Sequence, residues 1–374
     1  MLEHLERNNR IIREFIDRYS KKKRPIEVSF RDLIPELSKI DRHTHLIHPY
    51  PAKLLAHIPN LFINNSILSK EQDYVLDPFC GTGTVLLESA LYKRRALGAD
   101  ANPLAQMIAK AKTCKLNGER LQKELCSLLK KSRNYKLIKI PDFSNRDYWF
   151  AEQTQIQLAK IYSAIVKIKN ENVRTFFLVN FSNCIRKVSY ADPRVSVPVR
   201  INKNRFKLND DRHKKIKIRL AQLNKMDVFE KFESICTDNI ERIKKLKIET
   251  GSVEIISNDA RKLTTKIGGK KRLKRNCIQL IITSPPYAGA QKYIRASSLS
   301  LGWLGIAKNG QLKKLDNESI GRESFLAKEK TLTKTGIPEA DNLIKKIYEI
   351  NETRATIVST YLNEMKVALS ESYR

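Results

Sequence analysis

A strand, a glycine turn, a helix and a second strand follow one another between Tyr74 and Pro103, and this order limits the fold more than any other feature of the sequence. The segment reads YVLDP, FCGTGT, VLLESALYK and RALGADANP. Short apolar runs that end in Pro, Gly or Asn turns are typical of buried parallel strands, and the stretch between them has the length of a helix. The pattern predicts a βαβ unit and therefore an α/β fold with a parallel sheet.

The glycine turn lies where such folds bind ligands. Gly81 and Gly83 let the backbone approach a ligand closely, and the helix that follows offers free N–H groups at its N-terminus. A GxG turn alone is weak evidence, because glycine also serves the geometry of a tight turn. The second strand ends at Asp100, however, at about the 20-residue spacing with which βαβ nucleotide sites hold a ribose. We therefore expect Asp100 to bind a ribose diol.

Two further parallel strands are predicted at Val253–Ser257 and Ile278–Thr283. Each ends in a polar or proline turn, and parallel strands bring such turns to the edge of the sheet where open α/β folds bind ligands. Asp259 follows the first of these strands. Its carboxylate is expected to accept the adenine amine of the cofactor that Asp100 binds.

The second of these strands leads into a Ser-Pro-Pro-Tyr loop at residues 284–287. Two successive prolines remove backbone donors and stiffen the loop. Methyl transfer to an exocyclic amine needs acceptors for the amine hydrogens and an aromatic face for the base. Ser284 and the Pro285 carbonyl can supply the acceptors, and Tyr287 can supply the face. By itself, the tetrapeptide favours an ordinary rigid turn.

Together, these motifs resemble those of the S-adenosylmethionine-dependent DNA amino-methyltransferases. DPFCGTGT is similar to motif I of that family, the strand ends at Asp100 and Asp259 to its other cofactor motifs, and TSPPY to its catalytic motif IV. The (S/T)-P-P-Y form is typical of enzymes that methylate cytosine N4, whereas adenine-N6 enzymes usually carry an acidic or amide residue first. The HPYPAK segment at His48–Lys53 is similar to one that precedes motif I. The resemblance covers residues 45–105 and 250–290.

The resemblance implies a Rossmann-like class I methyltransferase sheet, S-adenosylmethionine as cofactor, and double-stranded DNA as substrate, as in restriction-modification systems. The candidate catalytic residues are Ser284, Pro285, Pro286 and Tyr287. The candidate cofactor-binding residues are Lys53, Asp77, Pro78, Phe79, Gly81, Thr82, Gly83, Thr84, Asp100, Asn102, Asp259 and Thr283.

The charge of the chain favours a polyanionic partner. Lys and Arg total 71 against 40 Asp and Glu, which gives a formal net charge of +31. The distance along the chain between motif I and motif IV exceeds what a βαβαβ path needs, so an insertion must lie between the second and third strands. Residues 186–219 of the insertion are basic and rich in turns, and we expect the DNA-contacting element there. The candidate DNA-binding residues are Arg194, Arg200, Lys203 and Arg205.

The pattern divides the chain into four parts. Residues 1–44 are expected to be an N-terminal helical segment with a helix at 3–19, and residues 45–114 the cofactor-binding half of the methyltransferase domain. Residues 115–250 are a helical and basic insertion, and residues 251–374 the catalytic half. Within these parts, helices are predicted at 105–131 and 153–187, and an exposed, turn-rich segment at 190–225.

The catalytic half is predicted to be incomplete. After Tyr287 the sequence shows mainly loop and helix signals, with apolar residues at helical spacing across 340–372. The resembling enzymes continue into further strands that complete the sheet. We therefore expect the C-terminal strands to be missing, and a second chain to pair with the exposed fourth strand. The alternative is that residues 288–340 contain short strands.

Several other classes of protein are not supported by the sequence. No apolar run reaches bilayer length and the N-terminus lacks a signal peptide, so we expect a cytoplasmic protein. The cysteines lack CxxC pairing and the histidines lack metal-ligand spacing, so neither disulfides nor a metal are expected. The functional alternatives are a DNA adenine-N6 methyltransferase, an RNA guanine-N2 methyltransferase, and an inactive DNA-binding specificity subunit.

Overall fold

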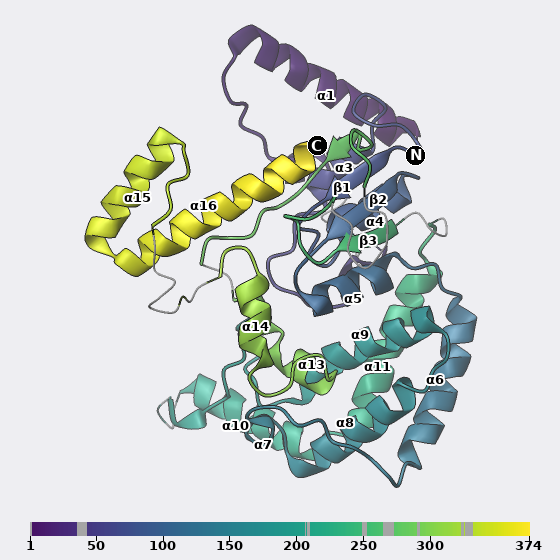
Figure 1. The fold of residues 1–374 in the computed structure, drawn as a ribbon. Helices are drawn as coiled ribbons and strands as arrows, with labels where there is room; N and C mark the ends of the chain where they lie inside the picture. The colour runs from purple at the N-terminus through teal and green to yellow at the C-terminus, as the bar shows by residue number, and fades with distance from the viewer. Residues whose placement is uncertain are drawn as a thin grey trace.

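A parallel sheet with the strand order β3-β2-β1-β4 organises the upper part of the molecule (Figure 1). The computed structural model describes residues 2–35, 43–205, 207, 210–248, 253–264, 273–289, 292–322, 325 and 332–374. Within these residues, the strands are β1 Tyr74–Asp77, β2 Arg95–Ala99, β3 Val253–Ser257 and β4 Leu280–Ile281. The predicted α/β class is confirmed. The fourth strand is shorter than the predicted Ile278–Thr283.

The predicted βαβ unit is confirmed, and small residues allow its helix to pack closely on the sheet. β1 pairs with β2 in parallel from Tyr74 opposite Arg95 to Asp77 opposite Gly98. The helix between them, α4 Thr84–Leu91, is buried along most of its length. A Cβ atom at Gly98 would lie 2.8 Å from Leu86 Cδ1. Glycine at this position therefore lets α4 approach β2.

The N-terminal segment covers one side of the sheet region. It contains α1 Leu2–Lys22, α2 Phe30–Leu33, the 3-10 helix η2 His43–Leu46 and α3 His57–Ile63. One face of α1 is apolar, and its residues Ile11 and Ile12 form a small core with Ile34 and Leu61. The predicted helix at 3–19 is confirmed and extends to Lys22.

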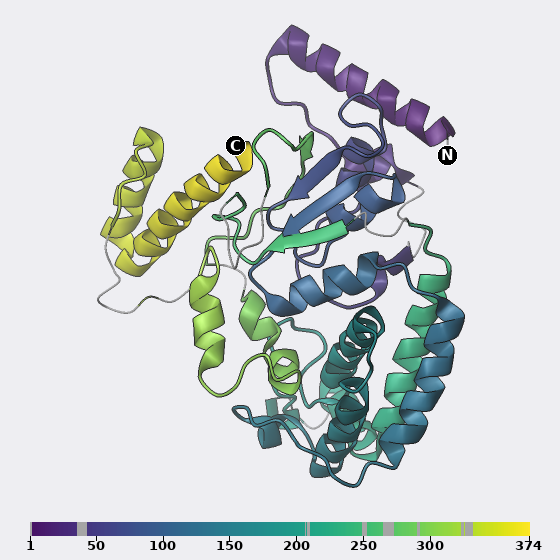
Figure 2. The same cartoon turned by 45° about the vertical axis from the view of Figure 1, so that its right-hand side comes forward.

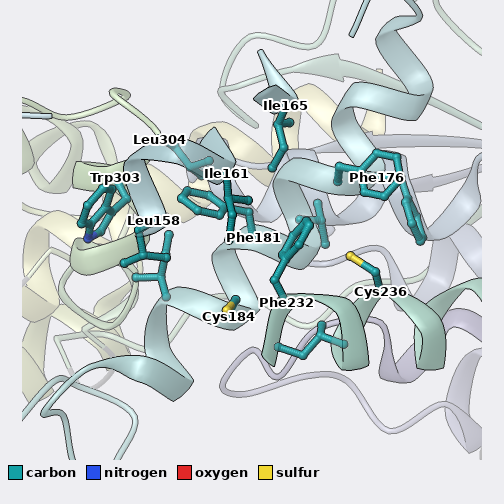
Figure 3. Close-up of a cluster of buried hydrophobic side chains, with 14 of the residues drawn as sticks. Leu158, Ile161, Ile165, Phe176, Phe181, Cys184, Phe232, Cys236, Trp303 and Leu304 are labelled. Carbon is teal, nitrogen blue, oxygen red and sulfur yellow. The ribbon is translucent and has the colours of Figure 1, made fainter. Parts of the chain in front are cut away.

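The insertion forms a helical layer below the sheet (Figures 1 and 2). After α5 Pro103–Thr113 come α6 Gly118–Arg133, α7 Arg146–Trp149, α8 Glu152–Ile165, α9 Glu171–Val188, the 3-10 helix η3 Lys203–Arg205, α10 Asp211–Lys225 and α11 Val228–Lys244. The buried side chains of α8, α9 and α11 form the core shown in Figure 3, which also contains Trp303 and Leu304 from the catalytic half. The insertion and the catalytic half therefore share one hydrophobic core.

The two predicted helices at 105–131 and 153–187 are wrong as continuous elements, and the helical spacing across 340–372 likewise covers two helices, because an asparagine begins a new helix inside each of these stretches. Asn117 separates α5 from α6, Asn170 separates α8 from α9, and Asn351 separates α15 Pro338–Ile350 from α16 Glu352–Tyr373. In each case the side chain accepts a backbone N–H of the following helix and thereby caps it. The turn-rich segment predicted at 190–225 is also partly wrong, since its second half forms α10.

The described part of the catalytic half after β4 is helical. It contains α12 Tyr293–Ala296, α13 Ser298–Trp303, α14 Gln311–Glu318, α15 and α16. Within the described residues, no strand pairs with the outer side of β4. The end of α16 lies beside this strand (Figure 1). The Asn276 N–H, just before β4, donates to the Arg374 carbonyl at the end of α16 at 3.0 Å. The pairing of a second chain with β4 stays a prediction, as do the four domain boundaries.

Candidate active site

A pocket opens at the carboxyl ends of all four strands. Residues that directly follow β1, β2 and β3 line it, together with Ser284 in the loop that β4 leads into, as the strand-end motifs predict. The predicted residues that it brings together are Lys53, Asp77, Pro78, Phe79, Gly81, Thr82, Thr84, Asp100, Asn102, Asp259, Ser284, Pro286 and Tyr287. Three predicted residues, Gly83, Thr283 and Pro285, are not among the lining residues.

The glycine turn is held against β2 and faces open space. The Cys80 N–H donates to the Ala99 carbonyl at 2.9 Å, and the Gly83 N–H donates to the Cys80 carbonyl at 2.7 Å. Gly81 has a φ of +49°, and no atom lies within 4 Å of the position that a Cβ would occupy there. The backbone at Gly81 is therefore open to a ligand.

Asp100 links the end of β2 to the glycine turn. Its carboxylate accepts the Gly81 N–H at 2.9 Å and the Asn102 N–H at 2.8 Å. Burial raises its pKa to about 6. The Asn102 side chain caps α5 and donates to the Tyr50 hydroxyl at 2.9 Å and to the Ser297 hydroxyl at 3.1 Å. This network places Tyr50 in the wall of the pocket.

Asp77 connects motif I with motif IV. Its carboxylate accepts the Thr283 hydroxyl at 2.7 Å and the Phe79 N–H at 3.1 Å. Burial raises the pKa of Asp77 to about 7, while these two hydrogen bonds act in the opposite direction. Thr283 therefore contacts a pocket residue instead of the pocket itself, and it joins the two loops that parallel strands bring together.

Asp259 forms part of a charged cluster in the pocket wall. Its carboxylate accepts the Arg261 Nε–H at 2.8 Å, and Arg261 also pairs with Glu364 of α16 at 2.7 Å. Another guanidinium N–H of Arg261 donates to the Glu318 carbonyl at 3.1 Å. Arg261 thus attaches both α16 and the C-terminal end of α14 to the pocket.

Lys53 enters the pocket from the HPYPAK segment. Its ammonium donates to the carbonyls of His45 at 3.2 Å and His48 at 2.5 Å, and burial lowers its pKa to about 8. The segment and the residues just before it are fixed from both sides, because His45 hydrogen-bonds the buried Glu88 of α4 at 2.8 Å and His48 hydrogen-bonds Ser182 of α9 at 3.0 Å. The position of Lys53 therefore follows from its packing against two helices.

The Ser-Pro-Pro-Tyr loop lies at the mouth of the pocket. The Tyr287 side chain is 56% exposed, so one face of its ring is available for stacking. The Gly289 N–H donates to the Gly321 carbonyl at 3.0 Å, and a Cβ at Gly321 would lie only 2.6 Å from the Tyr287 carbonyl oxygen. The segment that ends at Gly321 therefore packs directly on the loop.

Sequence reasoning missed several residues of the pocket wall, among them Tyr50, Tyr293 and the Glu318–Ser319–Ile320 segment. Tyr50 lies inside HPYPAK, so the motif contained it, but only Lys53 has a charge that suggests ligand binding. Tyr293 and residues 318–320 lie in or beside α12 and α14, and nothing in the local pattern brings them to the sheet edge. Their position depends on tertiary packing.

The predicted DNA-binding residues lie outside this pocket, in the insertion. Arg194 forms a two-point ion pair with Asp192, with a shortest N–O distance of 2.6 Å. The guanidinium of Arg200 lies over the rings of Tyr148 and Tyr190, at 4.5 and 5.0 Å from their centroids. Lys203 and Arg205 are exposed on η3. The four side chains are therefore in different environments.

The charge of the pocket is opposite to that of the whole chain. Its charged lining residues among the described part of the chain are Lys53 and four carboxylates, namely Asp77, Asp100, Asp259 and Glu318. Such a pocket suits a cationic ligand with an amine or hydroxyl groups to donate. The described residues contain no group of three or more His, Cys, Asp or Glu that could hold a metal ion. None of their helices is both long and apolar enough to cross a membrane.

Comparisons with known proteins agree with the motifs. The sequence model of a family of N6/N4 DNA methylases matches residues 4–111. The chain is 26% identical over 361 residues to the Type II methyltransferase M.MvaI of Kocuria varians, in an alignment that covers 88% of this chain and 74% of the relative. It is 30% identical over 104 residues to the Type II methyltransferase M.MjaII of Methanocaldococcus jannaschii, covering 28% of this chain and 19% of that relative. No solved structure matches the chain.

The family match covers the βαβ unit and the HPYPAK segment, and the alignment with M.MvaI extends over most of the rest of the chain. Enzymes of this family use S-adenosylmethionine as methyl donor. That molecule carries a sulfonium cation, an amine and a ribose diol, which the acidic pocket with its open glycine turn can accommodate. On the motifs, the fold, the pocket and the relatives together, the chain is similar to the N6/N4 family of DNA methyltransferases.

Proposed function

We propose that this enzyme methylates the N4 amine of cytosine at a specific site in double-stranded DNA. The observation that carries the proposal is the position of Ser284 and Tyr287 in the wall of the acidic pocket, at the same sheet edge as Asp100 and Asp259. A hydroxyl at the first position of the loop accepts a hydrogen bond without adding a negative charge beside the base. This is the form of the loop that resembles cytosine-N4 enzymes.

In this proposal the chain holds both reactants, while S-adenosylmethionine supplies the methyl group. Asp100 accepts the ribose hydroxyls, Asp259 accepts the adenine amine, and Lys53 binds the carboxylate at the methionine end. Each of these roles pairs a charged group with a polar group of the cofactor in a partly buried site, where such hydrogen bonds are strong.

The catalytic loop orients the base. The Ser284 hydroxyl and the Pro285 carbonyl accept the two hydrogens of the exocyclic amine, which directs the nitrogen lone pair toward the methyl group. The exposed ring of Tyr287 stacks on the base. Because an amine inside a duplex cannot reach such a pocket, the target nucleotide must leave the base stack.

Product analysis tests the proposal directly. The purified chain is incubated with unmethylated genomic DNA and isotope-labelled S-adenosylmethionine, and the nucleosides are then separated by mass spectrometry. We expect labelled N4-methylcytosine, confined by sequencing to one sequence context. The Ser284→Ala variant serves as a control for contaminating activity.

Each other result points to a specific alternative. Labelled N6-methyladenine would show that the target base is adenine and not cytosine, within the same family. Label in guanine of added RNA would favour an RNA guanine-N2 methyltransferase. Absence of label, together with absence of S-adenosylmethionine binding in calorimetry, would favour an inactive DNA-binding subunit.

A further inference from the structure

A second cavity lies beside the active site, on the opposite side of α12. We call it the α7–α13 cavity. Tyr293 of α12 lines the active-site pocket, whereas Arg295, two residues along the same helix, lines the second cavity. The residues that line it are Phe143, Ser144, Asn145, Trp149, Val197, Pro198, Arg295, Ser298, Leu299, Gly302, Ala307, Lys308, Gly310 and Leu312. Its walls thus come from α7, from the loop before η3, and from α12, α13 and the segment that follows α13.

The lining combines aromatic rings with unpaired cations. Phe143 and Trp149 provide aromatic surface, and the hydroxyl and amide groups of Ser144, Asn145 and Ser298 provide hydrogen-bonding atoms. Arg295 and Lys308 are exposed, and neither side chain forms an ion pair or hydrogen bond with another described residue. Aromatic faces beside free cations are the groups that bind an unstacked base and its phosphate.

The aromatic wall continues onto the surface that carries the predicted DNA-binding residues. Trp149 packs edge to face with Tyr148, with ring centroids 5.0 Å apart, and Arg200 lies over Tyr148. The loop that supplies Val197 and Pro198 is closed by the Ala191–Arg200 bridge. Arg186 of α9 stabilises this loop, because its guanidinium donates to the carbonyls of Asp192, Val195 and Ser196. The wall is therefore preformed and continuous with a basic surface.

We propose that the α7–α13 cavity binds an unstacked nucleotide of the DNA strand, with its base against Trp149 and its phosphate between Arg295 and Lys308. The occupant is part of a DNA strand and not a free nucleotide, because Arg200 lies over Tyr148 beside Trp149, and the exposed Lys203 and Arg205 follow Arg200 in the chain, where they suit further phosphates. The inference rests on the proposed DNA substrate. It adds a site for a second nucleotide to the pocket for the target base.

Tryptophan fluorescence gives a direct test, since the chain contains two tryptophans and Trp303 is fully buried in the core. We expect a single-stranded oligonucleotide of mixed sequence to quench the fluorescence of Trp149, because a base that stacks on indole quenches it. Heparin, a polyanion without bases, should bind the basic surface without this quenching. Equal quenching by heparin, or none by the oligonucleotide, would overturn the proposal.

Variants separate stacking from charge. Trp149→Ala should weaken oligonucleotide binding by about 5- to 150-fold, the range for removal of one stacked base, and Trp149→Phe should retain much of the affinity. Arg295→Gln with Lys308→Gln should weaken binding and flatten its salt dependence by about 0.7 for each phosphate that is no longer neutralised. The matched control is Lys130→Gln with Lys131→Gln on α6, which removes the same charge away from the cavity.

Cofactor affinity, measured by calorimetry, monitors folding and should be unchanged in all these variants. Unchanged oligonucleotide affinity in Trp149→Ala would contradict the proposal even if the enzyme methylates cytosine. Conversely, the fluorescence and binding experiments require no turnover, so they can support the cavity even if product analysis identifies another target base.

Discussion

Two buried carboxyl groups, Asp77 and Asp100, give the cofactor pocket a built-in dependence on pH. Their pKa values are raised to about 7 and about 6, above the ordinary value of 3.8. The stability that these two groups contribute to the cofactor-free fold is thus greatest below pH 3.8 and is lost as pH rises through 6 and 7. A cationic ligand has the opposite preference, because it favours the ionised carboxylates.

We therefore predict that the affinity for S-adenosylmethionine rises between about pH 5.5 and 7.5, with release on binding that approaches about two protons at the acidic end and falls as pH rises. Calorimetry in two buffers of different ionisation enthalpy measures both quantities. Asp77→Asn keeps the side-chain shape and should reduce the proton release. A wild-type affinity that does not change over this range would contradict the prediction.

In the proposed function, Ser284 and Tyr287 act on the base, whereas Asp100 acts on the cofactor. Ser284→Ala and Tyr287→Ala should lower the rate of methyl transfer by orders of magnitude and leave cofactor affinity nearly unchanged. Asp100→Ala should weaken cofactor binding first, since it removes a charged acceptor. Single-turnover rates and calorimetry on the same preparations distinguish the two effects. Equal loss of cofactor binding in all three variants would refute the assigned roles.

At the scale of secondary structure, the packing of α4 against α5 depends on Gly83. This residue caps α4 with a φ of +74°, and a Cβ there would lie 2.9 Å from Ala109 Cβ. Gly310 serves as the control position for Gly83. It also caps a helix, α14, with a similar φ of +79°, but no atom lies within 4 Å of its Cβ position.

Both Gly→Ala changes introduce left-handed backbone strain of about 1–2 kcal/mol. Gly83→Ala adds a steric clash, so its free energy of unfolding in urea should fall by about 1–3 kcal/mol more than that of Gly310→Ala. The second substitution Ala109→Gly should restore part of the difference. Equal losses in the two single variants would show that α4 can shift without cost.

The elements that the sequence predicted well are those whose signal is local. β1, α4 and β2 follow from apolar runs bounded by turn residues, and β3 was predicted with its observed limits. The joined helices were mispredicted because apolar spacing continues across Asn117, Asn170 and Asn351, and only the capping hydrogen bonds show where one helix ends. In α10, the many charged residues obscured the helical pattern.

The same distinction holds within the site. Residues that directly follow a strand could be predicted, because parallel strands bring their carboxyl ends to one edge whatever lies between them. Tyr293 and the 318–320 segment could not, because they reach the pocket through the packing of α12 and α14. The hydrogen bond between Asp77 and Thr283 was predictable only in part. Both residues were predicted in the site, but the direct contact between them follows from the pairing of β1 with β4.

At the scale of the whole molecule, the chain has a net charge of +31, but the charged residues that line the pocket are mainly acidic. We expect the basic surface to attract DNA over the screening distance of salt solutions, and the pocket to attract the cationic cofactor at short range. Binding of the two ligands should therefore respond differently to salt. Added salt should weaken DNA binding far more than cofactor binding.

The cations that contact DNA can be identified from the salt dependence of binding. Removal of Arg194, Arg200, Lys203 and Arg205 by Gln substitution should flatten the log–log salt dependence of duplex DNA binding, by about 0.9 for each phosphate that is no longer neutralised. Among the single variants, Arg194→Gln should have a smaller effect than Lys203→Gln, because Asp192 already neutralises Arg194. Fluorescence anisotropy between low and moderate salt measures the slopes.

The matched control removes equal charge from the far side of the insertion. Lys130, Lys131, Lys136 and Lys167 line a shallow surface pocket at the end of α6, and α6 and α10 lie on opposite sides of the helical layer in Figure 1. Their replacement by Gln lowers the net charge by the same amount, so any general electrostatic effect appears in both variants. If both variants flatten the slope equally, the net charge of the chain governs DNA binding. If only the first does so, the phosphates contact the surface formed by η3 and the loop before it.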